Sequence, residues 1–494
     1  MKNTKKSILS IIRRHKVDKK VALVFGNEAL KYDELLNLVE EYAEKFCFLG
    51  IKKGVSVLTV LPNGIQMTIT MLALADIGAI LVPLNPKYKN HQILKAAITS
   101  KAKFIVHEGK IPIFSEVKAV DLGRLQDFGR LSYSPSESED APYILTMTSG
   151  STGDPKPIIF SQATKINRAL SASKLYDLHP YDSILCGTPQ YHSLGQRLTL
   201  LPLLLGGTCV LLKEFEPHSW ISNIREYSVT FTIGVSSQLT ALLPLLEQQN
   251  QDFKSLKRIV SSSSSLDKEV KEKLIELLPC HFHECYGASE VGTVTDFDII
   301  TYKEKLASVG RAVPDAEIVI RGVNDEALGN YEVGEITVKS TTAFLGYFEK
   351  AELTGRVVKA GYFYTGDLGF LDDDGFLYFK GRKKEIIISG GINIYPEDVE
   401  NIVNNFEGIQ ESAVFPVPSE KLGELIAAVF VADHKIEINE LRSYCMKYLA
   451  SHQVPIFFRQ VNELPKTPLG KIQRKHCLSL YEDIFVSKIN ALNI

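Results

Sequence analysis

The chain has 494 residues, and single hydrophobic cores stop growing at roughly 250–300 residues, so at least two domains are expected. Hydrophobic residues make up 45% and charged residues 23% of the chain, values typical of a folded globular protein rather than a disordered one. Lys and Arg total 56 against 58 Asp and Glu, so no strong net charge favours binding to nucleic acid or to an anionic membrane.

The N-terminus begins with lysines, as a signal peptide does, but its apolar run, residues 8–12, is short and is followed by Arg13 and Arg14. We expect a solvated amphipathic first helix there. The most apolar window, residues 67–82, contains Asp76 and is too short for a membrane span of about 20 residues, so it predicts a buried helix running into a strand. The seven cysteines form no Cys-x-x-Cys pair, which argues against structural zinc and a disulfide framework. These features predict a cytoplasmic protein with no membrane span.

Up to about Val309 the chain alternates strand-like and helical stretches, a pattern typical of a mostly parallel sheet. The expected strands are residues 21–25, 55–60, 79–83, 104–106 and 208–212, and the expected helices are residues 32–48 and 65–74. Short strands then follow at residues 316–321, 334–338, 369–371 and 376–379, which indicates a small antiparallel or barrel-like unit.

After residues 381–384 the alternation of helix and strand returns, with helices expected at 397–404 and 437–449 and strands at 411–417 and 427–432. The sequence therefore predicts an α/β fold with two domains. Residues 1–382 are expected to form a large N-terminal domain of parallel-sheet α/β subdomains plus a small β-barrel. Residues 383–494 are expected to form a small α+β C-terminal domain.

The segment TSGSTGDPK, residues 148–156, follows an extended stretch and has the composition of a phosphate-binding loop. Its glycines let backbone N–H groups converge, its hydroxyls add donors and its lysine adds a cation. The spacing differs from that of the GxxxxGK[ST] loop, and a flexible Gly/Ser connection is the alternative. The candidate nucleotide ligands here are Thr148, Ser149, Gly150, Ser151, Thr152, Gly153 and Lys156.

Together with five later segments in the same order, this loop resembles the adenylate-forming superfamily of acyl- and aryl-CoA ligases, peptide-synthetase adenylation domains and firefly luciferases. The matching segments are YGASE (286–290), YTGD (364–367), GRKKE (381–385), GGINIYPE (390–397) and PKTPLGKIQR (465–474). By this resemblance, the adenine lies against Tyr286, Gly287, Ala288 and Ser289.

The resemblance also gives individual side chains a role that their chemistry suits. Asp367 accepts both ribose hydroxyls, and Arg382 adds donors to the ribose or phosphate. Glu290 holds Mg²⁺, a hard cation that takes oxygen ligands. Lys471 stabilises charge on the attacking carboxylate and the α-phosphate. A turn aspartate, a solvated glutamate and surface basic residues are the structural alternatives.

A rotation at the hinge residue Lys384 would withdraw Lys471 and bring in the thiolation loop, represented by Gly390, Gly391 and Asn393, so that a thiol reaches the adenylate. By the resemblance, the large domain, residues 1–382, binds ATP and the acid, and the small, mobile domain, residues 383–494, carries the catalytic lysine and the thiolation face. The second step is likewise an expectation from the resemblance.

The acyl pocket is expected at His192, Gly234, Ser236, Ser263 and Gly287, with His192 at the carboxylate site or, alternatively, a buried structural histidine. Residues 191–205 contain no acid to pair with a substrate amino group, which favours a plain carboxylic acid over an α-amino acid. Serines replace the usual glycines and alanines at 261–265, so we expect a small or functionalised acid rather than a long fatty chain.

The predicted activity is formation of an acyl-adenylate from ATP, Mg²⁺ and a carboxylic acid, followed by transfer to CoA. Transfer to the phosphopantetheine arm of a carrier protein and a catalytically silent nucleotide-binding protein are the alternatives. Nucleic acid is not expected as a partner.

Overall fold

The structure is a computed structural model that describes residues 7–109, 111, 116–136, 138–148, 156–248, 253–263, 266, 268–278, 280–389, 392–419, 423–467 and 470–492. Four sheets organise this part of the chain. None of the described helices combines the length and the apolar character that a membrane crossing requires.

The largest sheet has nine strands and is parallel through its centre, with antiparallel strands at both edges. Its order is β15 (Arg311–Ala312), β14 (Gly292–Asp298), β13 (His281–Ala288), β12 (Arg258–Ser262), β11 (Phe231–Val235), β9 (Ser183–Cys186), β10 (Thr208–Leu211), β1 (Val21–Phe25) and β2 (Glu28–Lys31). Because β11, β12 and β13 are parallel, their carboxyl ends meet at one edge, where ligands bind in open α/β sheets.

A second sheet has seven strands and is also mostly parallel. Its order is β18 (Gly346–Tyr347), β8 (Lys156–Ser161), β7 (Pro142–Thr148), β4 (Ile80–Pro83), β3 (Ser56–Val60), β5 (Phe104–His107) and β6 (Lys118–Asp121). The predicted parallel α/β architecture is confirmed.

The two sheets share one hydrophobic core, to which four long helices contribute buried side chains. These are α2 (Tyr32–Phe48), α3 (Ile65–Ile77), α5 (Gln162–Leu175) and α6 (Ser193–Leu205). Helix α2 has the predicted bounds, and Glu34 of its first turn accepts a hydrogen bond from the Lys31 N–H at 2.8 Å. Helix α3 followed by β4 confirms the buried helix and strand predicted at residues 67–82.

The N-terminal helix differs from its prediction. Helix α1 (Ile8–Ile12) is a short turn followed by a 3₁₀ segment, η1 (Arg13–Asp18), and it is not solvated. Its apolar side chains enter the shared core, with Ile8, Leu9 and Ile12 fully buried. Burying three large apolar side chains in the core is more favourable in free energy than leaving them on a solvated amphipathic helix.

The outer faces carry further helices. Helices α7 (Pro217–Glu226), α8 (Ser236–Gln248) and α9 (Lys268–Leu277) pack with the nine-stranded sheet, and α4 (Asn90–Ser100) packs with the seven-stranded one. The short 3₁₀ segments η2 (Leu122–Asp127) and η3 (Lys303–Lys305) lie in connections.

The third sheet is antiparallel, as predicted, with β16 (Ala316–Arg321), β17 (Gly334–Ser340), β20 (Tyr362–Leu371), β19 (Val358–Lys359) and β21 (Leu377–Arg382). Helix α10 (Ala351–Val357) precedes β19. In the described residues its hydrogen-bonded path stays open between β16 and β21.

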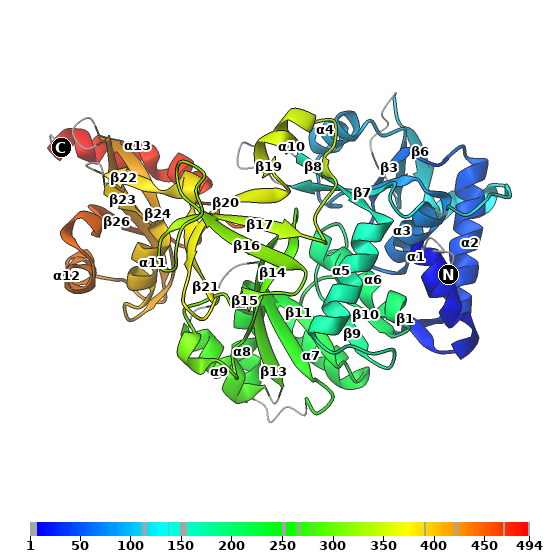
Figure 1. Cartoon of the computed structure of the whole chain (residues 1–494), viewed down its shortest axis with the longest axis horizontal. Helices are drawn as coiled ribbons and strands as arrows, with labels where there is room; N and C mark the ends of the chain where they lie inside the picture. Colours follow the sequence, from blue (N-terminus) through cyan, green and yellow to red (C-terminus); the bar gives the residue numbers. More distant parts are fainter. Residues whose placement is uncertain are drawn as a thin grey trace.

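The fourth sheet forms the α+β unit at one end of the molecule, drawn in orange and red beside β20 and β21 (Figure 1). It contains β23 (Ile392–Ile394), β22 (Ile387–Ser389), β25 (Gly423–Ala432), β24 (Ile409–Ser419) and β26 (Phe457–Gln460). Helices α11 (Pro396–Asn404) and α12 (Ile438–Tyr448) pack on one face and α13 (Arg474–Leu492) on the other. The 3₁₀ segments are η4 (Lys383–Glu385) and η5 (Ser451–Gln453). The domain boundary predicted between residues 382 and 383, which stays a proposal, coincides with the end of β21.

A cluster of charged side chains holds this small unit together. Arg474 reaches Glu385 at 2.6 Å, Glu400 at 2.8 and 2.5 Å, and Glu397 at 3.5 Å. Burial raises the pKa of Glu397 to about 7, although the Arg474 charge opposes that rise. One guanidinium therefore balances three carboxylates.

Replacing Arg474 with Met should leave these carboxylates without their cation and lower the free energy of unfolding of the small unit by about 3–5 kcal/mol. Hydrogen exchange at the amides of β24 and β25, measured in the whole chain, would detect the loss. Lys447→Met on the exposed face of α12 is the control and should exchange like the wild type. Unchanged exchange in Arg474→Met would show that the cluster contributes no net stability.

Candidate active site

The predicted phosphate loop lies mostly outside the described residues: Ser149, Gly150, Ser151, Thr152 and Gly153 cannot be placed. Its two flanks are described. Thr148 ends β7, Lys156 begins β8, and the two are paired in register across an antiparallel ladder. The loop is therefore a connection between two hydrogen-bonded strands of the seven-stranded sheet.

A buried carboxylate marks the predicted ribose site. Asp367 in β20 is 3% exposed, and its Oδ2 accepts a hydrogen bond from the Tyr286 hydroxyl at 2.8 Å. Arg382, directly opposite on β21, has its Nε 3.0 Å from Asp367 Oδ1. That oxygen has an ion-pair partner but no hydrogen bond of acceptable geometry. Burial raises the pKa of Asp367, and the Arg382 charge and the Tyr286 hydroxyl oppose that rise.

Lys471 of the small unit is near enough for its charge to act on this carboxylate and oppose the rise in its pKa. Burial and the Arg382 charge lower the pKa of Lys471, while Glu385, Asp367 and Glu397 act to raise it. The Lys471 loop is closed by hydrogen bonds from the Thr467 N–H to the Lys471 carbonyl at 2.8 Å and from the Lys471 N–H to the Thr467 hydroxyl at 3.1 Å.

The same loop touches the large unit where no side chain fits. Gly470 has a φ of +76°, and a Cβ built there would lie 2.1 Å from the Ser237 hydroxyl of α8. Glycine is required both by the left-handed backbone and by the close approach.

Glu290, the predicted Mg²⁺ ligand, lies in the turn between β13 and β14 and is partly buried. Its carboxylate accepts a hydrogen bond from the Tyr347 hydroxyl at 2.9 Å. Tyr347 belongs to β18 and pairs with Ile158 of β8, two residues after Lys156. Tyr347 thus links the Mg²⁺ candidate to the strand that leaves the phosphate loop.

The adenine motif lies on the same hairpin. Tyr286, Gly287 and Ala288 end β13, and the Ser289 carbonyl accepts a hydrogen bond from Arg168 at 2.9 Å. A Cβ at Gly287 would lie 2.2 Å from the Gly292 carbonyl oxygen, so the tight hairpin excludes a side chain there.

His192 is the N-cap residue of α6, and its Nε2 is buried without a hydrogen-bond partner. Burial lowers its pKa to about 4, so the imidazole is neutral near pH 7. A neutral ring with an unused nitrogen suits the carboxylate end of an acyl pocket.

The other predicted pocket residues lie at the carboxyl ends of β11, β12 and β13. Gly234 is buried in β11, and the hydroxyl of Ser236, which begins α8, lies 3.4 Å from that of Ser261. Ser263 has a left-handed φ of +81°, which glycine adopts without strain and serine does not. Gly287 completes this edge. The structure therefore places all four at one edge of the sheet.

The predicted hinge falls between two anchored residues. Lys383 pairs with Glu335 of β17 at 2.8 Å, whereas Glu385 pairs with Arg474 of the small unit. Lys384 between them is exposed and makes no ion pair with another described residue. Of the thiolation loop, Gly390 and Gly391 lie outside the described residues, and Asn393 is exposed on β23, with no recorded contact to Asp367 or Glu290.

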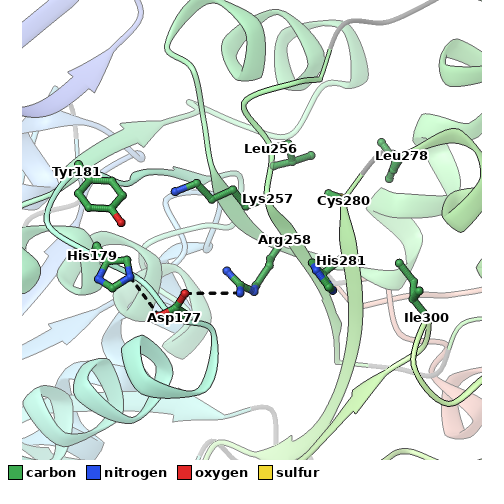
Figure 2. Close-up of a pocket in the computed structure, with 10 residues that line it drawn as sticks. All are labelled: Asp177, His179, Tyr181, Leu256, Lys257, Arg258, Leu278, Cys280, His281 and Ile300. Carbon is green, nitrogen blue, oxygen red and sulfur yellow. Dashed lines mark ion pairs between the residues drawn. The ribbon is translucent and has the colours of Figure 1, made fainter.

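A further pocket of the large unit lies elsewhere. Figure 2 shows it between the segment from Asp177 to Tyr181 and the first residues of β12 and β13, Arg258 and His281. These residues precede or begin their strands, so this pocket is at the amino-terminal edge of the sheet, opposite the predicted acyl pocket. It has no part in the proposed chemistry.

Three buried or partly buried cations were missed by the sequence interpretation: Lys165, Arg168 and Arg197. Lys165 donates to Gln196 at 2.7 Å, and Arg168 donates to the carbonyls of Thr342 and Ser289, both at 2.9 Å. Arg197 could have been singled out from the sequence, because it is the one charged residue in the apolar stretch SLGQRLTLLPLLL.

The residues present fit a nucleotide and a divalent cation: Asp367 offers a buried oxygen that accepts no hydrogen bond, and Glu290 offers a carboxylate next to the phosphate-loop strand. Lys471, the predicted catalytic lysine, is carried by the small unit. Fold and site together define an adenylate-forming enzyme.

Comparison with known families agrees with this class. A model described as AMP-binding enzyme matches residues 12–348, and one described as AMP-binding enzyme C-terminal domain matches residues 398–471. The chain therefore belongs to the AMP-binding enzyme family.

Individual relatives match nearly the whole chain. The chain is 30% identical to a long-chain-fatty-acid–CoA ligase of Bacillus subtilis (strain 168), over 93% of this chain and 91% of the ligase. It is 30% identical to a feruloyl-CoA synthase of Amycolatopsis sp, over 91% and 94% of the two chains. The solved o-succinylbenzoate CoA synthetase of Bacillus subtilis, in complex with its acyl-adenylate intermediate, has a TM-score of 0.88 and 26% identity, over 94% of this chain and 97% of that chain.

The neutral state of His192 predicts a pH dependence of stability. Between roughly pH 6.5 and 4 the unfolded chain binds a proton at this histidine that the folded chain does not, so lowering the pH destabilises the fold. His192→Gln removes this titration, and its thermal midpoint should fall less than that of the wild type between about pH 7.5 and 5.

His218→Gln, a change at an exposed histidine, is the control and should follow the wild type. Parallel curves for the wild type and His192→Gln would contradict a buried neutral His192.

Proposed function

We propose that this protein uses ATP to activate a carboxylic acid as an acyl-adenylate and then transfers the acyl group to the thiol of CoA. In the first step a carboxylate oxygen attacks the α-phosphorus and pyrophosphate leaves; in the second the thiol attacks the acyl carbonyl and AMP leaves. The observation that carries the proposal is the position of Lys471, which the small unit presents to the Asp367–Arg382 pair of the large unit.

Lys471 and Arg382 supply positive charge where negative charge develops. Lys471 is partly buried, where a cation is worth more than in water, whereas the Arg382 side chain is 45% exposed and is held by its ion pair with Asp367. Asp367 and the Tyr286 hydroxyl orient the ribose. Glu290 would hold Mg²⁺, which neutralises phosphate charge when bound.

The relatives favour CoA as the acceptor, since the three similar proteins named above are a CoA ligase, a CoA synthase and a CoA synthetase. A carrier protein is the alternative acceptor. The anchoring of Lys383 to one unit and Glu385 to the other supports a pivot at Lys384. Rotation there would exchange Lys471 for the loop that includes Asn393.

For the acid, we propose a chemical class and not a single compound. Ser263 is exposed at this edge of the sheet, and the hydroxyls of Ser236 and Ser261 are buried beside each other there. These hydroxyls support a functionalised acid over a long unbranched chain. The use of ATP and reduced cysteines agrees with the cytoplasmic location expected from the sequence.

The first test is acid-dependent release of pyrophosphate from ATP and Mg²⁺ over short, aromatic, hydroxylated, amino and long-chain acids, with and without CoA. Release should rise with one class of acid and rise further with CoA. Pyrophosphate release that CoA does not stimulate would favour a carrier protein as the acceptor. No release with any acid would favour a nucleotide-binding protein without catalysis.

Lys471→Ala should lower acid-dependent pyrophosphate release by roughly 100- to 1,000-fold, because one stabilising cation is lost. Thioester formation from a supplied acyl-adenylate should be nearly unchanged. Lys475→Ala, an exposed neighbour on α13, should keep both activities. Equal loss of both half-reactions in Lys471→Ala would contradict its assignment to the first step.

Lys384→Pro should impair the second half-reaction and spare the first, because proline fixes φ at the pivot and restricts the rotation. Thioester formation should fall while pyrophosphate release is retained, as single-turnover measurements of each half-reaction would show. Lys384→Ala keeps a rotatable backbone and is the control. If proline impairs both steps equally, Lys384 is not the pivot.

A further inference from the structure

Helix α6 carries one charge into the interior. Arg197 is its single charged residue, is partly buried, and donates from Nη1 to the Thr293 hydroxyl at 2.8 Å. Its Nε is buried and has no hydrogen-bond partner. A guanidinium has five N–H donors, so this one is incompletely satisfied by a neutral hydroxyl.

Arg197 lies on the wall of the proposed acyl pocket. Thr293 is the cross-strand partner of Gly287 in the β13–β14 hairpin, and His192 caps the amino end of the helix that carries Arg197. Burial raises the pKa of the Cys285 thiol, two residues before Gly287, to about 11, and the Arg197 charge is near enough to oppose that rise. Arg197 is therefore close to the β13–β14 hairpin and to the carboxyl end of β13, where the proposed pocket lies.

No carboxylate in the described part of the chain forms an ion pair with Arg197. The acids nearest to its surroundings have other partners. Asp296 accepts from Tyr176 at 3.0 Å and lies 2.9 Å from His283, Glu284 pairs with Lys271 at 2.6 Å, and Glu290 accepts from Tyr347 at 2.9 Å.

A second arginine increases the local positive charge. Burial, and then the charge of Arg197, lower the pKa of Arg168 to about 9. Arg168 donates hydrogen bonds to the backbone carbonyls of Thr342, Ser289 and Glu290. These neutral acceptors do not balance the positive charge of the two arginines. The Glu290 charge acts on Arg168 from nearby, but neither arginine forms an ion pair with a carboxylate in the described residues. Two like charges so placed form an environment that an anionic ligand would stabilise.

We infer that Arg197 determines specificity for an acid that carries a second carboxylate, at the end remote from the one that is adenylated. This inference rests on the proposed acid activation. A planar guanidinium binds a carboxylate through two parallel hydrogen bonds, and the free Nε and the remaining N–H groups of Arg197 supply them. A monocarboxylic acid in the same pocket leaves the buried cation unpaired.

The test compares matched pairs of acids, each a dicarboxylic acid and the monocarboxylic acid of the same length, in short aliphatic and aromatic series. Acid-dependent pyrophosphate release should give the diacid a kcat/KM at least about 10-fold higher in the wild type. Arg197→Gln should lower the diacid value by about 100-fold or more, leave the monoacid value within about threefold, and leave KM for ATP unchanged.

Arg197→Lys keeps the charge without the planar fork and should retain part of the preference. Thr293→Val removes the hydroxyl that accepts the hydrogen bond from Arg197 and should retain most of the preference for the diacid. Diacid and monoacid rates that fall together would assign Arg197 a merely structural role, and a raised KM for ATP would assign it to the phosphates; either result overturns the inference.

Calorimetric binding separates this inference from the proposed function. If no acid releases pyrophosphate, the proposed activity fails, yet tighter binding of diacids by the wild type than by Arg197→Gln, in the presence of an unreactive ATP analogue, would still support the anion site. Equal diacid binding by both proteins would overturn it.

Discussion

The approach of one loop to one buried carboxylate is the constraint on which the rest of the site depends. Lys471 can lie beside Asp367 because Gly470 lets the loop touch α8 at Ser237, where any larger residue would collide. The loop in turn runs into Arg474, which fixes it to Glu385 and Glu400. Packing of the small unit thus determines where the lysine reaches the large one.

Burial disfavours the charged forms of the two side chains at this contact, Asp367 and Lys471. The pKa of Asp367 is raised and that of Lys471 is lowered, so in each case the surroundings disfavour the charged form. A ribose hydroxyl on Asp367 and negative charge near Lys471 would each relieve part of that cost. The site is therefore more complementary to the nucleotide undergoing reaction than to water, which is the condition for catalysis by electrostatic preorganisation.

Much of the fold and of the nucleotide site could be predicted from the sequence because the determinants are local. Apolar spacing located α2 and the α3–β4 segment. Short motifs singled out Tyr286, Asp367 and Lys471, whose roles stay predictions. The first helix was misjudged as solvated because its apolar run finds its partners in a core built from distant elements. The sequence of the helix itself does not indicate which residues it packs against.

The supporting residues were harder to predict for the same reason. Tyr347 reaches Glu290 from 57 residues away, and Arg168 contacts the Ser289 carbonyl from 121 residues away. Neither has a local pattern that separates it from an ordinary surface residue. Arg197 differs, since a lone charge within an apolar helix is itself a signal that something must balance it.

The proposed nucleotide and acid sites are built from different elements, a division that would let one scaffold serve many acids. The proposed ATP-binding side chains lie on the β13–β14 turn and the β20–β21 pair, where strand register fixes them. The proposed acid-binding wall comprises the carboxyl ends of β11 and β12 and part of α6. Substitutions on that wall, such as a serine that retains the left-handed backbone at position 263, can alter the pocket without moving Asp367 or Glu290. Chemistry at the adenylate can thus be retained while the identity of the acid changes, and the acid must be sought in the side chains of the wall rather than in the motifs that define the family.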